Sequence, residues 1–159
     1  MTEETNDIEI DGINDGINNE INYDDLPHQR ILCIDMKSFY ASIEAVKRNL
    51  DPLQTYVVVI GDKNRKGSVV LAASPPMKSK YGIKTGNRLF EVQQAPEINI
   101  VEARMSLYLE QSLEITKLLN EFVPLEDLHI YYVHEAWLKL DRVIDIFGDK
   151  KEIAARLRE

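Results

Sequence analysis

The sequence predicts an α/β (α+β) fold in which a sheet is layered with helices on one face. Short apolar runs, which are typical of buried strands, alternate with stretches whose apolar residues recur every three or four positions, as on one side of a helix. The order of these elements is not a strict strand–helix–strand repeat. With 159 residues, 44% of them hydrophobic and 29% charged, the chain has the size and balance of a single globular domain.

The strands are predicted from apolar runs bounded by polar or turn-forming residues. The run at 31–34 is short and suited to a buried strand, and the run at 56–60 is the richest in β-branched residues. Between the second and third runs lies a basic turn at 61–67. The remaining strands are predicted at 68–73, 98–101, 128–132 and 136–140.

The helices are predicted from their periodicity and their end signals. Ser38 is a plausible N-cap for a helix whose apolar residues continue towards position 50. Pro75 and Pro76 can open a short helix around 77–81, and Pro124 ends a long amphipathic helix at 105–122. The face of the long helix is predicted to run through Leu109, Leu113, Thr116, Leu119 and Asn120. Two further helices are predicted at 142–147 and 149–158.

The formal net charge of -8 belongs to the N-terminal part of the chain. Residues 1–28 hold nine acidic residues and no Lys or Arg, whereas the rest holds the other 18 acidic residues and all 19 basic ones. Residues 1–26 are therefore predicted to be an acidic disordered tail. A loose four-residue repeat places Ile13, Ile17 and Ile21 at helical spacing, so the alternative is a segment that folds on a partner.

Composition also excludes several classes of protein. The single cysteine, Cys33, rules out a disulfide framework and a cysteine-based zinc cage, and it favours a reducing, cytoplasmic setting. No apolar run approaches the roughly 18 residues that a membrane span needs, so we expect no membrane partner. The acidic N-terminus is not that of a secretory signal.

Two carboxylates lie next to predicted strands. Asp35 follows the run at 31–34, and Glu135 lies in the polar step between the strands at 128–132 and 136–140. Carboxylates that converge at strand ends bind hard divalent cations such as Mg²⁺, which can activate an attacking hydroxyl and stabilise a leaving phosphate. From spacing alone, Asp35 could instead cap the next turn and Glu135 could lie in a solvated turn.

The segment 31–44, ILCIDMKSFYASIE, resembles the opening of the Y-family translesion DNA polymerases, whose catalytic core is the UmuC-type domain. Further motifs follow in the family's order, and the Gly-Asp-x-Asn-Arg segment resembles the branch found in Gram-positive bacteria and their mobile elements. These motifs are VVVIGD at 57–62, GSVVLAAS at 67–74, YGIKTG at 81–86, ARMSLY at 103–108 and YYVHEAWLKL at 131–140.

The resemblance implies roles for individual residues. Asp35 and Glu135 match ligands of the catalytic Mg²⁺ ions, of which the family has two, and the Met36 carbonyl matches a further ligand. Phe39 and Tyr40 match the turn that holds the triphosphate. Tyr40 also matches the ring that excludes a ribose 2′-hydroxyl, although it could be a core aromatic.

The resemblance also places side chains near the triphosphate after the strand at 68–73. Ser74, Lys78 and Lys80 are the candidates, because the alignment of SPPMKSKYG is uncertain by one residue.

Three residues depart from the family pattern. His134 occupies the position of a metal-ligating Asp, Lys37 replaces a common acid, and Tyr132 replaces a small Ser. Imidazole is a poorer Mg²⁺ ligand than carboxylate, so His134 indicates an altered site. The alternatives for His134 are a sequence error and a decayed site.

By this resemblance, residues 28–159 form a UmuC-type domain with a largely antiparallel palm sheet at 31–35, 98–101, 128–132 and 136–140. The palm would comprise about 28–38 and 98–159 and the fingers about 39–97, with the chain ending before the thumb. The implied function is the catalytic portion of an error-prone polymerase in DNA repair, damage tolerance and the SOS response. Its partners would be primer–template DNA and a dNTP, with replication or recombination proteins as further candidates. The alternative is a non-catalytic remnant that binds DNA or protein weakly.

Overall fold

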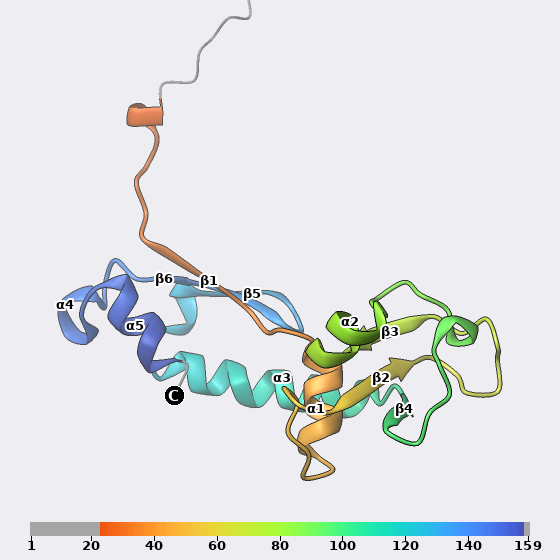
Figure 1. The fold of residues 1–159 in the computed structure, drawn as a ribbon. Coiled ribbons are helices and arrows are strands. Elements are labelled where there is room, and N and C mark those ends of the chain that lie inside the picture. Colours follow the sequence, from red (N-terminus) through yellow and green to blue (C-terminus); the bar gives the residue numbers. More distant parts are fainter. Residues whose placement is uncertain (1–22, 158–159) are drawn as a thin grey trace, which may run out of the picture.

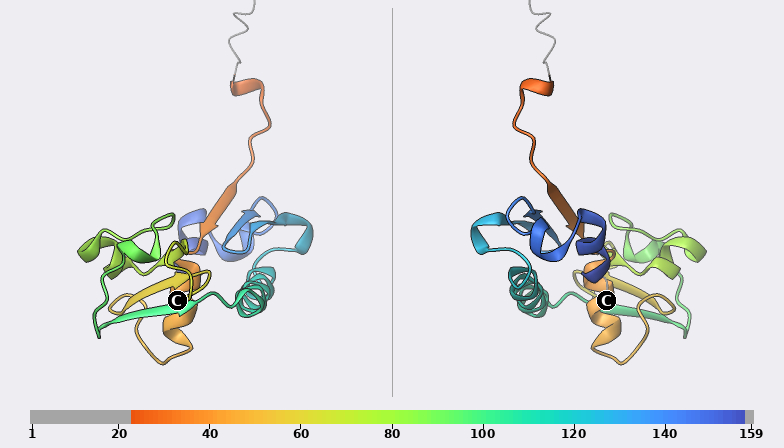
Figure 2. Two further views of the ribbon diagram at one scale, coloured as in Figure 1. Left: turned by 90° about the vertical axis from the view of Figure 1, so that its right-hand side faces the viewer. Right: turned by 90° about the vertical axis from the view of Figure 1, so that its left-hand side faces the viewer.

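The computed structural model describes residues 23–157, which form two neighbouring groups of strands and helices joined by one long helix (Figure 1). One group contains the sheet β1-β6-β5, and the other contains the sheet β3-β2-β4. Figure 2 shows the two groups side by side, with residues 23–30 extending away from them. The mixed α/β class predicted from the sequence is confirmed, and the strands within residues 23–157 form two three-stranded sheets.

The first sheet is antiparallel throughout. Strand β1 (Ile31–Asp35) pairs with β6 (Glu135–Lys139), and β6 pairs with β5 (Leu128–Tyr132). Leu32, Ile34, Ala136 and Leu138 pack on the helix-covered face of this sheet. The alternating residues, which include Cys33 and Trp137, are exposed on the opposite face. This alternation is the signature of a sheet with one buried face.

The prediction that residues 98–101 belong to this antiparallel sheet is wrong. Strand β4 (Ile98–Glu102) pairs in parallel with β2 (Tyr56–Ile60), and β2 pairs antiparallel with β3 (Val70–Ala73). Val57, Val58, Val59 and Ile60 are all fully buried because β2 is the central strand. A strand that is buried on both faces needs a hydrogen-bonded neighbour along each edge. β3 lies along one edge of β2, and β4 lies along the other.

Short helices surround the second sheet. Helix α1 (Phe39–Val46) and helix α2 (Pro75–Tyr81) both pack against β2. Pro75 and Pro76 start α2, as predicted, and Gly82 ends it in the left-handed conformation at φ 70°. Ser38 precedes α1 but makes no capping hydrogen bond with its side chain. The 3₁₀ turns are Tyr23–Asp25, Leu89–Glu91 and Leu125–Asp127.

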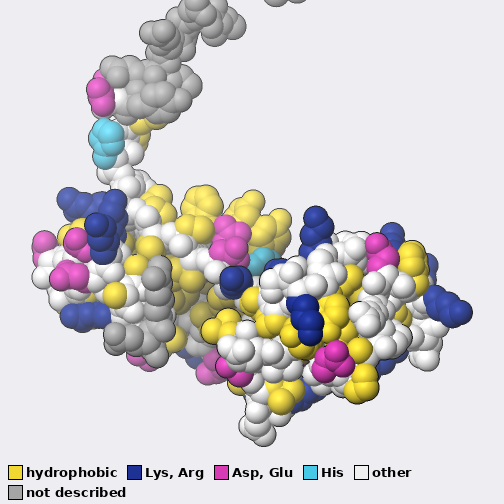
Figure 3. All heavy atoms as spheres, viewed as in Figure 1, with side chains coloured by type: hydrophobic (Ala, Val, Ile, Leu, Met, Phe, Trp, Pro, Cys, Tyr) yellow, Lys and Arg dark blue, Asp and Glu magenta, His cyan; other side chains and the backbone are white. Residues whose placement is uncertain are grey.

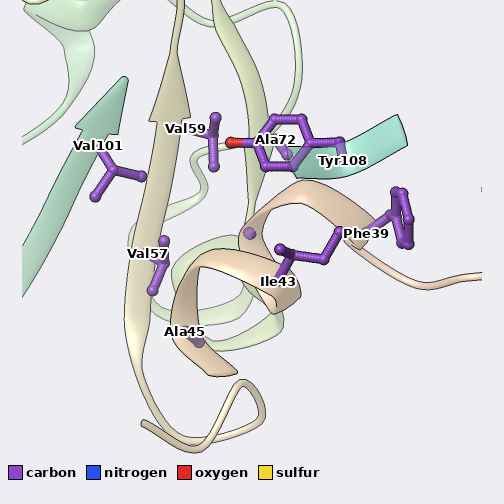
Figure 4. Packing of buried hydrophobic residues seen from close by; sticks show 9 residues of the cluster. Phe39, Ile43, Ala45, Val57, Val59, Ala72, Val101 and Tyr108 are labelled. Carbon is purple, nitrogen blue, oxygen red and sulfur yellow. The ribbon is translucent and has the colours of Figure 1, made fainter. Parts of the chain in front are cut away.

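Helix α3 (Met105–Asn120) links the two groups. Its first half places Tyr108 in the core around α1 and β2 (Figure 4), and its second half packs Leu119 on the β1-β6-β5 sheet. The predicted face was wrong in part, because Leu109 and Leu113 are 54% and 55% exposed. The buried residues are instead Tyr108 and Ser112, each one position before the leucine predicted to be buried.

The chain ends with α4 (Ile144–Phe147) and α5 (Lys150–Arg156), both within the predicted helical segments. Asp149 caps α5 by accepting hydrogen bonds from the amides of Lys151 and Glu152. Ile153 of α5 is fully buried in the core beneath the first sheet. Most of the predicted acidic tail, residues 1–22, lies outside the described residues. None of the helices formed within 23–157 is long and apolar enough to cross a membrane.

A buried carboxylate joins α1 to α3. The side chain of Glu44 on α1 is completely inaccessible. It accepts two hydrogen bonds from the Arg104 guanidinium, at 2.9 and 2.8 Å, and one from the Tyr108 hydroxyl at 2.9 Å. Arg48 forms an ion pair with the same carboxylate from one turn further along α1. Burial raises the pKa of Tyr108 to about 12, so its hydroxyl keeps the proton that it donates.

We expect Glu44→Gln to lower the free energy of unfolding by about 2–3 kcal/mol, because it removes a buried charge that pairs with the partly exposed side chains of Arg48 and Arg104. Urea unfolding at neutral pH measures this change. The control is Glu114→Gln, which breaks the exposed pair with Lys117 at 2.8 Å and should change stability by less than about 0.5 kcal/mol. Similar values for the two variants would show that the Glu44 network does not stabilise the fold.

The same network should stabilise the fold less at acidic pH. Burial acts to raise the pKa of Glu44, but hydrogen bonds from Arg104, Arg48 and Tyr108 outweigh it and hold that pKa below the ordinary 4.5. A carboxyl whose pKa is lower in the folded than in the unfolded state stabilises the fold at pH values above its unfolded-state pKa. This stabilisation is lost as the pH falls through its folded-state pKa. The difference in unfolding free energy between the native chain and Glu44→Gln should therefore be constant above about pH 5 and shrink below about pH 4. A difference as large at pH 3 as at pH 7 would contradict this explanation.

Candidate active site

One cavity of about 330 Å³ lies where the two groups of elements meet. Its walls come from the turn between β1 and α1, from β3 and α2, and from the tip of the β5–β6 hairpin. The residues that line it are Asp35, Met36, Lys37, Ser38, Phe39, Tyr40, Leu71, Ala72, Lys78, Thr85 and His134. Six of the nine residues predicted for the site therefore line this single space.

The turn from Asp35 to Phe39 is held in an unusual backbone conformation. The Met36 amide donates a 2.9 Å hydrogen bond to the His134 carbonyl, which ties the turn to the hairpin tip. Ser38 has φ 53°, the left-handed region that residues other than glycine seldom adopt. Its hydroxyl oxygen is buried and has no hydrogen-bond partner among the described residues. The turn thus brings the end of β1 and the start of α1 onto one side of the cavity.

Asp35 and Glu135 are direct register partners at one end of the β1–β6 pair. Side chains opposite each other in antiparallel strands lie on the same face, with Cβ atoms about 4.5–5.5 Å apart. Glu135 Oε1 accepts a 2.9 Å hydrogen bond from the Trp137 indole and a 3.8 Å contact from the Cys33 thiol.

The thiol of Cys33 lies close to the negative charges at this end of the sheet. Its pKa is raised above the usual 9.0, first by desolvation and then by the charge of Glu135, the hydrogen bond to Glu135 and the charge of Asp35. The register of β1 and β6 places the two carboxylates opposite each other, with Asp35 directly on the cavity.

His134 lies on the cavity at the hairpin tip, and its ring is parallel to that of Tyr132 at a centroid distance of 6.1 Å. Within 23–157 no three His, Cys, Asp or Glu side chains come together in a group that could hold a metal ion. Asp35 and Glu135 fit a hard cation as a pair of carboxylates, but the position beside them carries imidazole. The described residues thus provide two carboxylates at this end of the β1–β6 pair, and imidazole in place of a third.

Two aromatic residues begin α1 at the edge of the cavity. Tyr40 stacks on Tyr108, with ring centroids 4.3 Å apart and an interplanar angle of 13°. Phe39 is buried and lies 5.9 Å from the Tyr40 ring. The Tyr40 ring packs on a core residue and also lines the cavity, and its role in excluding a ribose 2′-hydroxyl stays a prediction.

The three triphosphate candidates after β3 have different surroundings. Lys78 lines the cavity. The Lys80 ammonium lies over the rings of Tyr56 and Tyr81, at 4.8 and 5.0 Å, and these contacts raise its pKa. Ser74 is fully buried, donating to the Thr55 carbonyl at 2.7 Å and accepting from the Val57 amide at 3.0 Å. The cavity thus includes Lys78 but neither Ser74 nor Lys80.

Sequence reasoning gave no role to Leu71, Ala72 and Thr85, which also line the cavity. Thr85 donates a 3.2 Å hydrogen bond to the Leu71 carbonyl and lies within the motif YGIKTG. Thr85 itself, the polar residue before the last glycine of that motif, was the available signal.

Comparison with known proteins gives the family. The profile of the impB/mucB/samB family matches residues 34–159. The chain is 52% identical over 111 residues to the DNA repair protein homolog YozK of Bacillus subtilis, a match covering 70% of this chain and 96% of YozK. It is 36% identical over 129 residues to DNA polymerase IV 2 of the same organism, covering 80% of this chain. The chain spans 30% of that polymerase and 28% of UvrX, a Bacillus subtilis protein with 52% identity over 118 residues.

Solved structures show the same fold. A Y-family DNA polymerase chimera of Dbh and Dpo4 matches with a TM-score of 0.67 and 22% identity, over 80% of this chain and 36% of the chimera. DinB from Sulfolobus solfataricus matches with a TM-score of 0.66 and 24% identity, over 80% of this chain and 36% of DinB. The resemblance drawn from the motifs is confirmed. The chain belongs to the impB/mucB/samB family and has the palm and fingers fold of the Y-family DNA polymerases.

Proposed function

We propose that this chain forms the dNTP-binding part of an error-prone translesion DNA polymerase that acts in DNA repair. The observation that carries the proposal is the single cavity onto which β1, α1, α2 and the β5–β6 hairpin all place residues. The names of its relatives, DNA polymerase IV 2 and a DNA repair protein homolog, support the same conclusion. Its substrates would be primer–template DNA and a dNTP.

The arrangement of charge in the cavity suits a nucleoside triphosphate. Asp35 marks one side, and the cations Lys37 and Lys78 lie among the other lining residues. A triphosphate requires cationic side chains for its oxygens and, through a bound metal ion, carboxylates near the reacting phosphate. Tyr40, held by its stack on Tyr108, would lie against the sugar and exclude a ribose 2′-hydroxyl.

Asp35 and Glu135, with the Met36 carbonyl, are the residues that would hold Mg²⁺. When bound, the ion would supply activation of the primer hydroxyl and charge stabilisation at the phosphate. Trp137 and Cys33 hold Oε1 of Glu135, so the carboxylate is oriented before any cation binds.

A second candidate function is a non-catalytic nucleotide- or DNA-binding protein of the same fold. His134 favours it, because imidazole at the position of a third carboxylate lowers the negative charge available to two divalent cations. The two candidates share the same cavity and differ in how strongly the chain binds divalent cations.

We expect Lys78→Gln to weaken binding of a fluorescent dNTP about tenfold, because a charge-assisted hydrogen bond to phosphate is removed. Lys80→Gln is the matched control. It removes the same charge from the same short helix, but the ammonium of Lys80 is engaged by Tyr56 and Tyr81. Binding should therefore change less than about twofold. An equal loss in both variants would contradict the assignment of the triphosphate to this cavity.

His134→Asp should raise the affinity of the chain for Mn²⁺ by about tenfold, since a third carboxylate joins Asp35 and Glu135. Titration followed by the paramagnetic signal of free Mn²⁺ measures this directly and does not depend on polymerase activity. His28→Asp adds the same charge at an exposed position outside the cavity and should leave the affinity unchanged. If His134→Asp also has no effect, residue 134 does not face the cation site.

A further inference from the structure

A second hollow lies beside the turn between β1 and α1, and we call it the α1–α3 groove. Its volume is about 260 Å³, and α1 and α3 form its two sides. The described residues that line it are Met36, Lys37, Phe39, Ser42, Ile43, Val46, Lys47, Gln111 and Ile115. Five of these nine side chains are apolar, and Val46 is 58% exposed. An open hollow with mainly apolar walls is the kind of surface that binds an apolar partner.

Two lysines give the groove a positive charge. Lys37 lies on the turn before α1 and Lys47 directly follows α1, and both are exposed. Within residues 23–157, neither lysine takes part in an ion pair. No acidic side chain is among the described residues that line the groove. A partner that carries carboxylates beside its apolar residues would therefore be complementary to this surface.

The N-terminal segment of the same chain has this composition. Isoleucines recur at positions 10, 13, 17 and 21, which is the spacing of one side of a helix. Glu9 lies four positions before Ile13, and Glu20 lies three positions after Ile17. A helix would therefore place both carboxylates beside the isoleucines. Residues 1–28 contain no Lys or Arg that would repel the two lysines of the groove.

This segment needs a partner if it is to be helical. Gly12, Gly16 and several asparagines have low helix propensity, so the pattern does not favour a helix that stands alone. Burial of the isoleucines would supply the missing stability, as when hydrophobic grooves bind amphipathic helices. Ile13 and Ile21 are eight positions apart, which is about 12 Å along a helix, and the same spacing separates Phe39 from Lys47. The isoleucine stripe and the groove therefore match in length.

The connection to the fold is long enough for the segment to reach the groove. Strand β1 separates Ile31 from Met36, a span of about 17 Å. The ten steps from Ile21 to Ile31 can span up to about 33 Å, so the chain can double back along β1. The tether also gives the segment an effective concentration at the groove on the order of millimolar. A weak interaction is therefore enough to fill the groove.

Another exposed apolar surface is unsuitable for an acidic partner. Ile31 and Trp137 are 49% and 41% exposed on the outer face of the first sheet. Figure 3 shows hydrophobic side chains along the upper edge of the molecule, where Figure 1 places β1, β5 and β6, with acidic side chains beside them. Asp35 and Glu135 are register partners on this face. Their charges would repel the carboxylates of the segment, whereas the groove offers lysines.

We propose that residues 9–21 fold as a helix into the α1–α3 groove of the same chain, with the four isoleucines on its apolar walls and Glu9 and Glu20 near its lysines. The docked segment would lie against Met36, Lys37 and Phe39, which also line the nucleotide cavity. The docking itself does not depend on what the cavity binds.

The test is paramagnetic broadening in NMR spectra of the full chain. A nitroxide is attached at Asn19→Cys, on the side of the helix opposite the isoleucines, in a Cys33→Ser background that leaves one attachment site. The amide signals of Ile43, Val46 and Ile115 should be lost by broadening. The signals of α5 and of the 3₁₀ turn Leu89–Glu91, which do not line the groove, should keep their intensity.

Ile17→Asn should restore the groove signals, because it places a polar side chain in the middle of the isoleucine stripe. Ile8→Asn is the matched control. It makes the same change nine positions earlier, on the opposite side of the helix, and should leave the broadening as in the native segment.

The charges are tested in the same way. The double variant Lys37→Gln, Lys47→Gln should weaken the broadening, whereas Lys150→Gln, Lys151→Gln, which removes the same charge from exposed positions on α5, should not. A mixture of nitroxide-labelled chains with isotope-labelled chains that carry no nitroxide should show no broadening. Broadening in this mixture would overturn the assignment to the same chain. Intact groove signals in the native segment, or equal effects of a variant and its control, would overturn the docking itself.

Discussion

The buried carboxylate of Glu44 holds together the parts of the chain on which the rest of the structure depends. Arg104, one of its partners, lies between the end of β4 and the start of α3, so the ion pair fixes where the long helix leaves the second sheet. Tyr108, another partner, stacks on Tyr40 at the cavity. A charge enclosed in the core is tolerated because each of its oxygens is hydrogen-bonded, and the geometry of the cavity wall follows from those bonds.

This dependence explains why the cavity lies between the two sheets. The β1–α1 turn and the hairpin tip belong to the edge of one sheet, whereas Leu71, Ala72 and Lys78 belong to the other. Helix α3 is packed into both cores, so it sets the separation of the two walls. The Met36–His134 hydrogen bond then closes the wall formed by the first sheet. The cavity is therefore lined partly by turn residues, which are held in place by the two packed sheets that they connect.

Much of this could be predicted from the sequence, because local signals were strong. The apolar runs located every strand, the two prolines located the start of α2, and Asp35 and Glu135 were placed at strand ends that the structure pairs directly. The partner of β4 could not be predicted, because an apolar run does not specify which edge it joins. The predicted buried side of α3 was wrong by one position. Tyr108 lies in the core, where its hydroxyl donates to Glu44, while Leu109 and Leu113 remain exposed. Lys78 and Lys80 could not be separated by alignment, but residues two apart on a helix point in nearly opposite directions, so only one of them could reach the cavity.

The pairing of β1 with β6 also determines the order in which the molecule can be assembled. Cys33 and Glu135 are neighbours across this pair although they are 102 positions apart in the chain. By contrast, β2, β3 and β4 and their helices are contiguous in the chain and can close with much shorter loops. At translation rates of about 5–20 residues per second, β1 waits on the order of 5–20 s on the ribosome before its partner strand is synthesised. The second sheet can therefore form before β6 is synthesised, whereas Asp35 and Glu135 can meet only after β6 has been synthesised.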